Sequence, residues 1–218
     1  MKTNSNVSNA LFSLGNKMRL KRFVFLKKQF DKMSKPIRIL DVGGTQNYWK
    51  DKEVFNNSDY HITLLNLKKV DVDYSNVKSV SGDATNLSHY KEDKFDIVFS
   101  NSVIEHLYTY DNQVKMAKEI KRVGKLFFVQ TPNKYFLIEP HYVFPFFQFI
   151  PKKIGFLILT KTKLCRGYKW TDSYAQKYLD EIRLISLNEM KELFPDSHIY
   201  YEKICGLNKS FTAHNFPA

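Results

Sequence analysis

The chain has 218 residues, of which 43% are hydrophobic and 15% aromatic, enough for one well-buried core. Lys and Arg number 34 against 22 Asp and Glu, which gives a formal net charge of +12. An excess of this size favours anionic partners such as a phosphorylated glycan, nucleic acid or an acidic membrane face, although lysines spread along the whole chain also serve solubility. The two cysteines, Cys165 and Cys205, are too few for a disulfide framework, so reduced thiols and a cytoplasmic location are expected.

The sequence contains no stretch that we expect to direct secretion or to span a membrane. The apolar patch at residues 10–14 is short and is followed by basic residues. The most apolar later stretch, residues 137–159, is interrupted by Glu139, Lys152 and other polar side chains. A membrane span of about 20 apolar residues would not tolerate these interruptions.

Residues 1–35 are predicted to form a basic amphipathic helix. Apolar side chains recur there at helical spacing, and lysines and arginines occupy the other faces. The apolar stripe consists of Leu20, Phe23, Leu26, Phe30 and Met33. This pattern favours packing across the edge of the following domain. Attachment to an acidic membrane at its inner face is the alternative.

Residues 36–218 alternate between short β-type runs and helical segments. Strands are expected at residues 37–44, 61–67, 77–83, 94–102 and 125–133, with two closing strands in a hairpin around Gly206. A helix is expected at residues 114–123, and Ser186 with Glu189 forms the capping-box pattern that begins another. The alternation predicts a Rossmann-like, doubly wound α/β domain with a mostly parallel, seven-stranded sheet.

Residues 134–170, directly after the fifth strand, are predicted to be an aromatic insertion. The aromatic side chains are Tyr135, Phe136, Tyr142, Phe144, Phe146, Phe147 and Phe149, interspersed with Pro140, Pro145 and Pro151. Insertions at the carboxyl edge of an α/β sheet are places where acceptor pockets are built, although a purely structural cap is the alternative. Phe146, Phe147 and Phe149 could also dip into a membrane interface, which would suit a lipid-linked glycan.

The first strand ends in Asp41 and turns through Gly43 and Gly44, which lets a ligand approach the backbone closely. The loop lacks the G-x-G-x-x-G pattern of a dinucleotide site, and no phosphate-binding P-loop occurs. No His, Cys or carboxylate group has convincing metal-ligand spacing, because Glu105 and His106 are adjacent and are expected to point in different directions on a helix. We therefore predict no metal site.

The glycine turn and the stretch "SNSVIEHL" at residues 100–107 resemble the class I S-adenosylmethionine-dependent methyltransferases, in the small, single-domain, type 11-like group. The likeness covers residues 37–133 and implies an enzyme with S-adenosylmethionine as its cofactor. It places Asp41, Gly43, Gly44 and Thr45 under the methionine part, Asn66 at the ribose hydroxyls, Asp83 and Ala84 at adenine, and Ser100 with Asn101 near the transferred methyl. The family usually has Asp or Glu at the ribose position, so the neutral Asn66 predicts a weaker clamp.

Methylation of a hydroxyl requires a base whose pKa lies near neutrality. His106, after the fourth strand, and His141, in the insertion, are the candidate catalytic residues. The favoured function is O-methylation of a small-molecule, sugar or glycan-type acceptor, which could be anionic or lipid-linked. An RNA methyltransferase is less favoured, because the fourth strand lacks the Asn/Asp-Pro-Pro-aromatic tetrad of amino-methylating enzymes. A non-catalytic, methyltransferase-like binding or scaffold protein is the third alternative.

Overall fold

The computed structural model describes residues 3–50, 52, 54 and 56–217, and only the backbone of residues 3–14. The chain divides into two compact units, Met1–Ser34 and Lys35–Ala218. The first unit consists of helix α1 (Thr3–Asp31), which begins well before the predicted apolar stripe and ends before Met33. Among the described residues, no helix combines the length and the apolar character that a membrane span needs.

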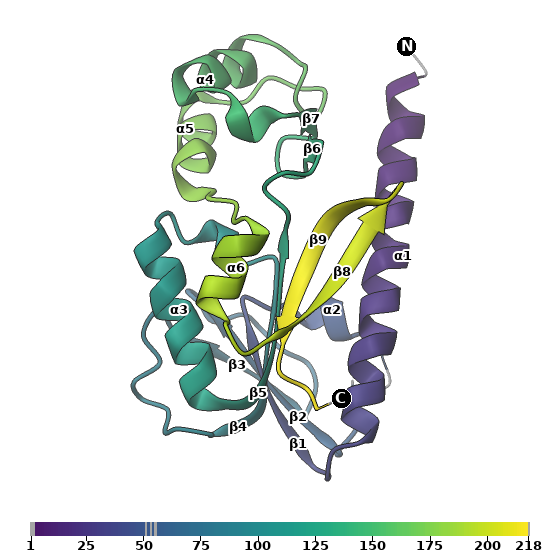
Figure 1. The fold of residues 1–218 in the computed structure, drawn as a ribbon, viewed down its shortest axis with the longest axis vertical. Coiled ribbons are helices and arrows are strands. Elements are labelled where there is room, and N and C mark those ends of the chain that lie inside the picture. The colour runs from purple at the N-terminus through teal and green to yellow at the C-terminus, as the bar shows by residue number, and fades with distance from the viewer. Residues whose placement is uncertain (1–2, 51, 53, 55, 218) are drawn as a thin grey trace. The chain divides into compact units, whose positions relative to one another are not determined.

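The described part of the second unit contains a seven-stranded sheet with the strand order β3-β2-β1-β4-β5-β9-β8 (Figure 1). The strands are β1 (Ile37–Val42), β2 (Tyr60–Asn66), β3 (Val77–Ser81), β4 (Phe95–Asn101), β5 (Gly124–Pro132), β8 (His198–Ile204) and β9 (Leu207–His214). Strands β1 to β5 pair in parallel, and β9 is antiparallel to both of its neighbours. This topology confirms the predicted Rossmann-like fold and the closing hairpin.

The central strands are apolar on both faces because both faces are buried. In β1 the side chains of Ile37, Ile39, Leu40 and Val42 are at most 1% exposed, as expected for a strand inside a parallel sheet. Strand β1 pairs with β2 on one side and with β4 on the other. The order of the strands therefore reverses between β1 and β4. Ligands of open α/β sheets bind at the carboxyl ends of the strands beside such a reversal.

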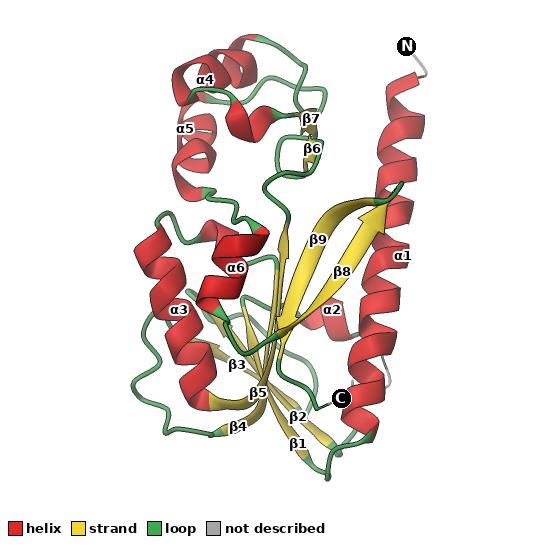
Figure 2. Ribbon diagram, in the orientation of Figure 1, coloured by secondary structure: helices red, strands yellow, loops and turns green. Residues whose placement is uncertain are grey.

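Helices α3 (Tyr110–Val123) and α6 (Leu187–Leu193) cover one face of the sheet (Figure 2). The predicted capping box is present, because the Ser186 side chain accepts from the backbone of Glu189 and the Glu189 side chain accepts from the backbone of Ser186. Helix α2 (Gln46–Trp49) is a single turn whose Trp49 packs edge-on against Phe99 of β4. The connections from β2 to β3 and from β3 to β4 contain no helix in the described chain, so the helical cover is less complete than the alternation predicts.

Residues 134–181 form a small substructure that we call the aromatic lobe, seen above the sheet in Figure 1. Its elements are β6 (Ile138–Glu139), β7 (Phe144–Pro145), the 3₁₀ turn η2 (Phe147–Phe149), α4 (Lys152–Lys161) and α5 (Asp172–Glu181). The lobe has its own apolar core, formed by Tyr142, Phe147, Leu159, Cys165, Trp170, Ala175 and Leu179. Because α5 contributes to this core, the inserted structure extends beyond residue 170.

The lobe buries one of the phenylalanines that the membrane alternative places at an interface. Phe147 is 2% exposed and stacks on Tyr142 with the ring centroids 3.9 Å apart. Phe146 and Phe149 are each 51% exposed. The membrane alternative is therefore wrong for Phe147, whose ring fills the core of the lobe.

Candidate functional site

The turn after β1 requires glycine at two positions. Gly43 has φ of +72°, and a Cβ atom there would lie 2.4 Å from Cγ2 of Val103. A Cβ atom on Gly44 would lie 1.7 Å from Oδ2 of Asp41, so no side chain fits beside that carboxyl group. Thr45 follows as the N-cap residue of α2 and is exposed. The loop is thus a tight backbone cradle at the carboxyl end of the strand.

Two buried polar atoms at this edge of the sheet have no hydrogen-bond partner among the described residues. Asp41 is 1% exposed, and its Oδ2 accepts a bond of 2.7 Å from Nε1 of Trp49, while its Oδ1 has no partner. Burial raises the pKa of Asp41 to about 7, although the Trp49 bond opposes this rise. Ser100, near the end of β4, is fully buried, and its Oγ also lacks a partner. Unpartnered buried polar atoms are costly, which fits a place where a polar ligand binds.

The remaining predicted cofactor residues follow the ends of neighbouring strands. Asn66 ends β2, and its Nδ2 donates to the carbonyl of Gly44 over 2.8 Å. Asp83 is exposed after β3, and its Oδ1 accepts from the backbone and the hydroxyl of Thr85, each over 2.8 Å. Ala84 is half-buried beside Asp83, and Asn101 ends β4. Parallel strands end at the same edge, so the structure brings these residues together as the sequence predicts.

A second group of polar residues follows β4 in the 3₁₀ turn η1 (Ile104–His106). Glu105 is fully buried, and its Oε2 accepts a bond of 3.0 Å from Oγ1 of Thr131 on β5. Its Oε1 has no hydrogen-bond partner within the described structure, and burial raises the pKa of this carboxyl group. His106 places Nδ1 2.8 Å from Oε1 of Glu181 on α5.

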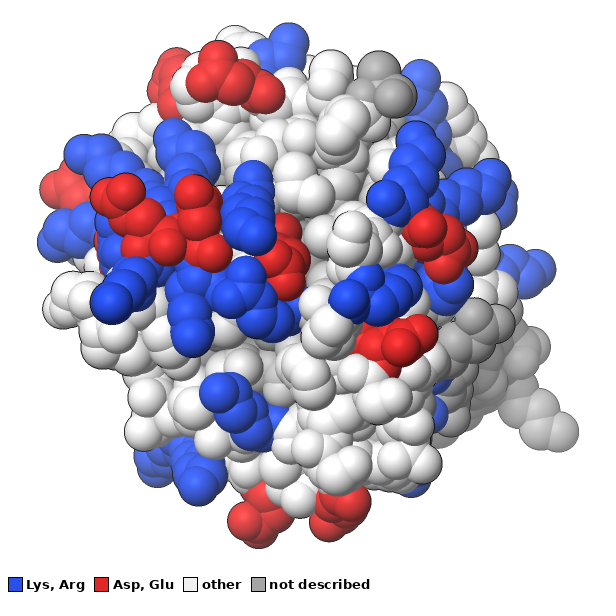
Figure 3. All heavy atoms as spheres, turned by 90° about the horizontal axis from the view of Figure 1, so that it is seen from below, with Lys and Arg blue, Asp and Glu red and all other residues white. Residues whose placement is uncertain are grey.

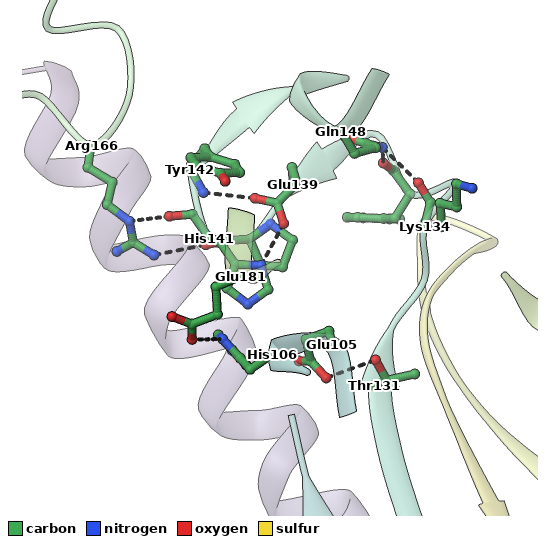
Figure 4. A network of polar contacts seen from close by, with 12 residues as sticks. Glu105, His106, Thr131, Lys134, Glu139, His141, Tyr142, Gln148, Arg166 and Glu181 are labelled. Atoms are coloured by element: carbon green, nitrogen blue, oxygen red, sulfur yellow. Dashed lines mark hydrogen bonds and ion pairs between the residues drawn. The ribbon is translucent and has the colours of Figure 1, made fainter. Parts of the chain in front are cut away.

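His141 of the aromatic lobe completes this group (Figure 4). Its Nδ1 lies 2.6 Å from Oε1 of Glu139, which is 1% exposed and whose Oε2 accepts from the backbone of Tyr142. Burial disfavours the charged ring of His141, but the bond to Glu139 and the charge of Glu139 outweigh it and raise the pKa. The rings of His106 and His141 meet edge to face, with centroids 4.9 Å apart.

Glu105, His106 and His141 form what we call the Glu-His-His cluster, since one ligand-type atom from each lies within 4.8 Å of those of the other two. Glu105 and His106 lie in a 3₁₀ turn and contact different elements, β5 through Thr131 and α5 through Glu181. The sequence did not predict that their ligand-type atoms stay close together, or that the chain returns from the lobe to add His141. The sequence analysis missed the supporting roles of Glu139 and Glu181. Glu139 could have been found from its place two residues before His141, but no local signal marks Glu181.

The glycine turn and the Glu-His-His cluster are adjacent because both touch the segment that follows β4. Val103 lies against Gly43, and Glu105 follows two residues later. Thr131, which binds Glu105, lies near the carboxyl end of β5. One edge of the sheet thus carries a cradle for a ligand and, beside it, two imidazoles paired with carboxylates.

Comparison with known proteins shows that part of the chain and its fold are similar to methyltransferases. Residues 46–126 match a family model described as a methyltransferase domain. The fold resembles a SAM-dependent methyltransferase from Methanosarcina mazei, with 12% identity over 84% of this chain and 93% of that one, at a TM-score of 0.55. It also resembles the CurJ carbon methyltransferase, with 12% identity over 90% of this chain and 53% of that one, at a TM-score of 0.53. A search among curated protein sequences found no match.

Residues 46–126 match the methyltransferase family model, and the fold of the chain is that of solved S-adenosylmethionine-dependent methyltransferases. Together they support an enzyme that uses S-adenosylmethionine as its cofactor. The structure fits this cofactor, because the cradle at Gly44 admits only backbone and the unpartnered atoms of Asp41 and Ser100 lie at the same sheet edge. The solved relatives share little sequence identity with this chain, so they establish the fold and leave the methyl acceptor open.

Proposed function

We propose that the enzyme methylates a hydroxyl oxygen of a small-molecule, sugar or glycan-type acceptor. The observation that carries this proposal is the pairing of each histidine in the Glu-His-His cluster with a carboxylate, His106 with Glu181 and His141 with Glu139. A carboxylate on Nδ1 orients an imidazole and stabilises its charged form, which suits a general base. The cluster lies beside the cofactor cradle, where a base for the acceptor is needed.

S-Adenosylmethionine supplies a methyl group whose bond to sulfur breaks as the acceptor oxygen takes the carbon, and the electron pair stays on sulfur. The protein's own work is to remove the hydroxyl proton and to exclude water. Nε2 of His106 or His141 receives that proton, since Nδ1 of each ring already faces a carboxylate. The aromatic lobe holds His141 against the ring of His106, so it supplies a base to the site.

The acceptor class rests on the surroundings of the site. Exposed aromatic side chains of the lobe, such as Tyr135 and Phe149, suit the faces of sugar rings. The net charge of +12 suits an acceptor that carries phosphate or carboxylate groups. Figure 3 shows the face on the opposite side of the sheet from the site, where Lys and Arg side chains lie among Asp and Glu side chains.

The test is methyl transfer from labelled cofactor to nucleotide sugars, lipid-linked oligosaccharides and RNA. We expect transfer to a hydroxyl of a sugar-containing acceptor, and a decrease in kcat of about 100-fold or more for His106→Ala or His141→Ala. His61→Ala, at an exposed position on β2, is the matched control and keeps full activity. Cofactor affinity, measured by calorimetry and expected to be about micromolar, stays unchanged in all three variants. Methylation of RNA alone, or full activity in both cluster variants, would refute the proposal.

A further inference from the structure

The Glu-His-His cluster has the arrangement of a metal site in its ligands and in the groups behind them. We propose that Glu105, His106 and His141 bind one divalent transition-metal ion of the zinc class. Two imidazoles and one carboxylate are a donor set that suits zinc and its neighbours, whereas magnesium and calcium prefer oxygen ligands alone. Three protein ligands leave a coordination position for an exogenous oxygen.

The orientation of the two rings is the first support. Metal-binding histidines commonly donate the ring N–H that does not face the metal to a carboxylate. Both histidines here follow this pattern, with Nδ1 of His106 on Glu181 and Nδ1 of His141 on Glu139. Among the contacts of the described residues, Nε2 of neither ring has a hydrogen bond. Both Nε2 atoms are therefore available as ligands.

Glu105 is the second support. It is fully buried, and Thr131 holds its Oε2, yet its Oε1 has no partner in the described part of the chain. A buried carboxylate oxygen without a partner is costly, and a cation is the ligand that compensates it most fully. Glu139 and Glu181 add further negative charge behind the rings, so the surroundings attract a cation.

The distances allow an ion after a small contraction. The three ligand atoms lie within 4.8 Å of one another. Around a zinc ion, with bonds of about 2.0–2.2 Å, neighbouring ligand atoms are about 3.0–3.5 Å apart. Side-chain rotations that move the ligand atoms by roughly 1–2 Å bring them to these distances. Glu105 and His106 belong to the turn after β4, whereas His141 belongs to the lobe, so the ion would tie the lobe to the sheet.

The role of the ion, unlike its binding, rests on the proposed function. An acceptor oxygen in the open position is polarised by the ion, which lowers the pKa of its hydroxyl. In the metal-bound enzyme the ion engages both Nε2 lone pairs, so the hydroxyl proton passes to solvent water, whereas in the metal-free enzyme it passes to a histidine. The ion and the histidine base are thus two distinguishable ways of activating the same acceptor.

Binding can be measured on the full chain without any acceptor. The protein carries Cys205→Ser to remove an exposed thiol, is freed of metal with a chelator, and is titrated with Zn²⁺ by calorimetry and with Co²⁺ by visible absorption. We expect one ion per chain with a micromolar or lower dissociation constant. Glu105→Gln and His141→Ala should weaken binding by at least about tenfold, and Glu139→Gln by about 10–100-fold. His61→Ala should bind as the parent does.

An independent readout is hydrogen exchange. Zn²⁺ should slow exchange in α5 and β6 of the parent, and should not do so in Glu105→Gln, whose side chain keeps its size and whose folding is checked by circular dichroism. Absence of stoichiometric binding, or equal affinity in the parent and the cluster variants, overturns the metal site. Zinc binding without methyl transfer to any hydroxyl refutes the proposed function and supports the site. Methyl transfer that survives chelation and is lost in His106→Ala overturns the catalytic role of the ion.

Discussion

Asp41 is a buried acid whose charge state makes stability depend on pH. Its pKa of about 7 in the folded chain lies above its ordinary value of 3.8, so the folded state binds the proton more tightly than the unfolded state does. The contribution that this tighter proton binding makes to folding stability is fully present below pH 3.8 and is lost as the pH rises through about 7. The cofactor-free protein should therefore lose up to roughly 4 kcal/mol from this residue between these limits.

Asp41→Asn isolates this contribution, because its amide oxygen still accepts from Trp49 and no longer titrates. We expect the variant to gain stability relative to the parent as the pH rises from about 4 to 7, measured as the difference in unfolding free energy in urea. Burial lowers the pKa of His214 to about 4, and this gives a pH dependence of opposite sign, but it is common to both proteins and cancels in the difference. A difference that is constant with pH would contradict the prediction.

Asn66 has a structural role that a carboxylate could not fill. Its Nδ2 donates to the carbonyl of Gly44, so the amide holds the cradle in place. Asn66→Asp removes that donor and sets a carboxylate oxygen against a carbonyl oxygen. Because such a hydrogen bond contributes about 0.5–1.5 kcal/mol, we expect cofactor affinity to fall by about 3–10-fold in calorimetry. Tighter binding by Asn66→Asp would show that charge at the ribose matters more than the loop bond.

The aromatic lobe is an element with its own core, and Trp170 lies in the middle of that core. The centroid of its ring lies 4.8 Å from that of Tyr174 and 5.3 Å from that of Tyr178, and the residue is 4% exposed. Trp170→Ala should destabilise the lobe by about 3–5 kcal/mol and abolish methyl transfer while cofactor binding persists. Hydrogen exchange should accelerate in α4 and α5 and stay slow in β1 and β4. Equal acceleration in the sheet would show that the lobe and the sheet unfold together.

The sequence predicts the strands and helix caps whose formation depends on residues close together in the chain. The apolar runs of β1 to β5 and the Ser186–Glu189 capping box depend on neighbouring residues, and all are found where expected. The pairing of His106 with Glu181 joins residues 75 positions apart, and only the folded lobe brings them together. The cluster was also hidden because His141 belongs to the lobe, and only the folded chain brings its ring beside His106.

The charge of the whole molecule affects its stability. A net charge of +12 is self-repelling at low ionic strength. Raising NaCl from about 0.01 to 0.15 M shortens the screening length from about 30 to 8 Å. If this relieves about 1 kcal/mol, Tm should rise by about 2–4 °C. Sodium fluoride at equal ionic strength controls for specific binding of chloride, and a Tm that falls with salt would contradict the prediction.

Val103 lies between the two halves of the site, so we expect it to couple them. It touches Gly43 on one side and precedes the Glu-His-His cluster on the other, so a shift that tightens one half moves the other. By thermodynamic linkage, any factor by which a ligand at the cluster changes the affinity for the cofactor is the factor by which the cofactor changes the affinity for that ligand. Loading the cradle therefore also sets how firmly the cluster holds its own ligand. Whichever of the two binds first, the same coupling free energy applies to the doubly filled protein.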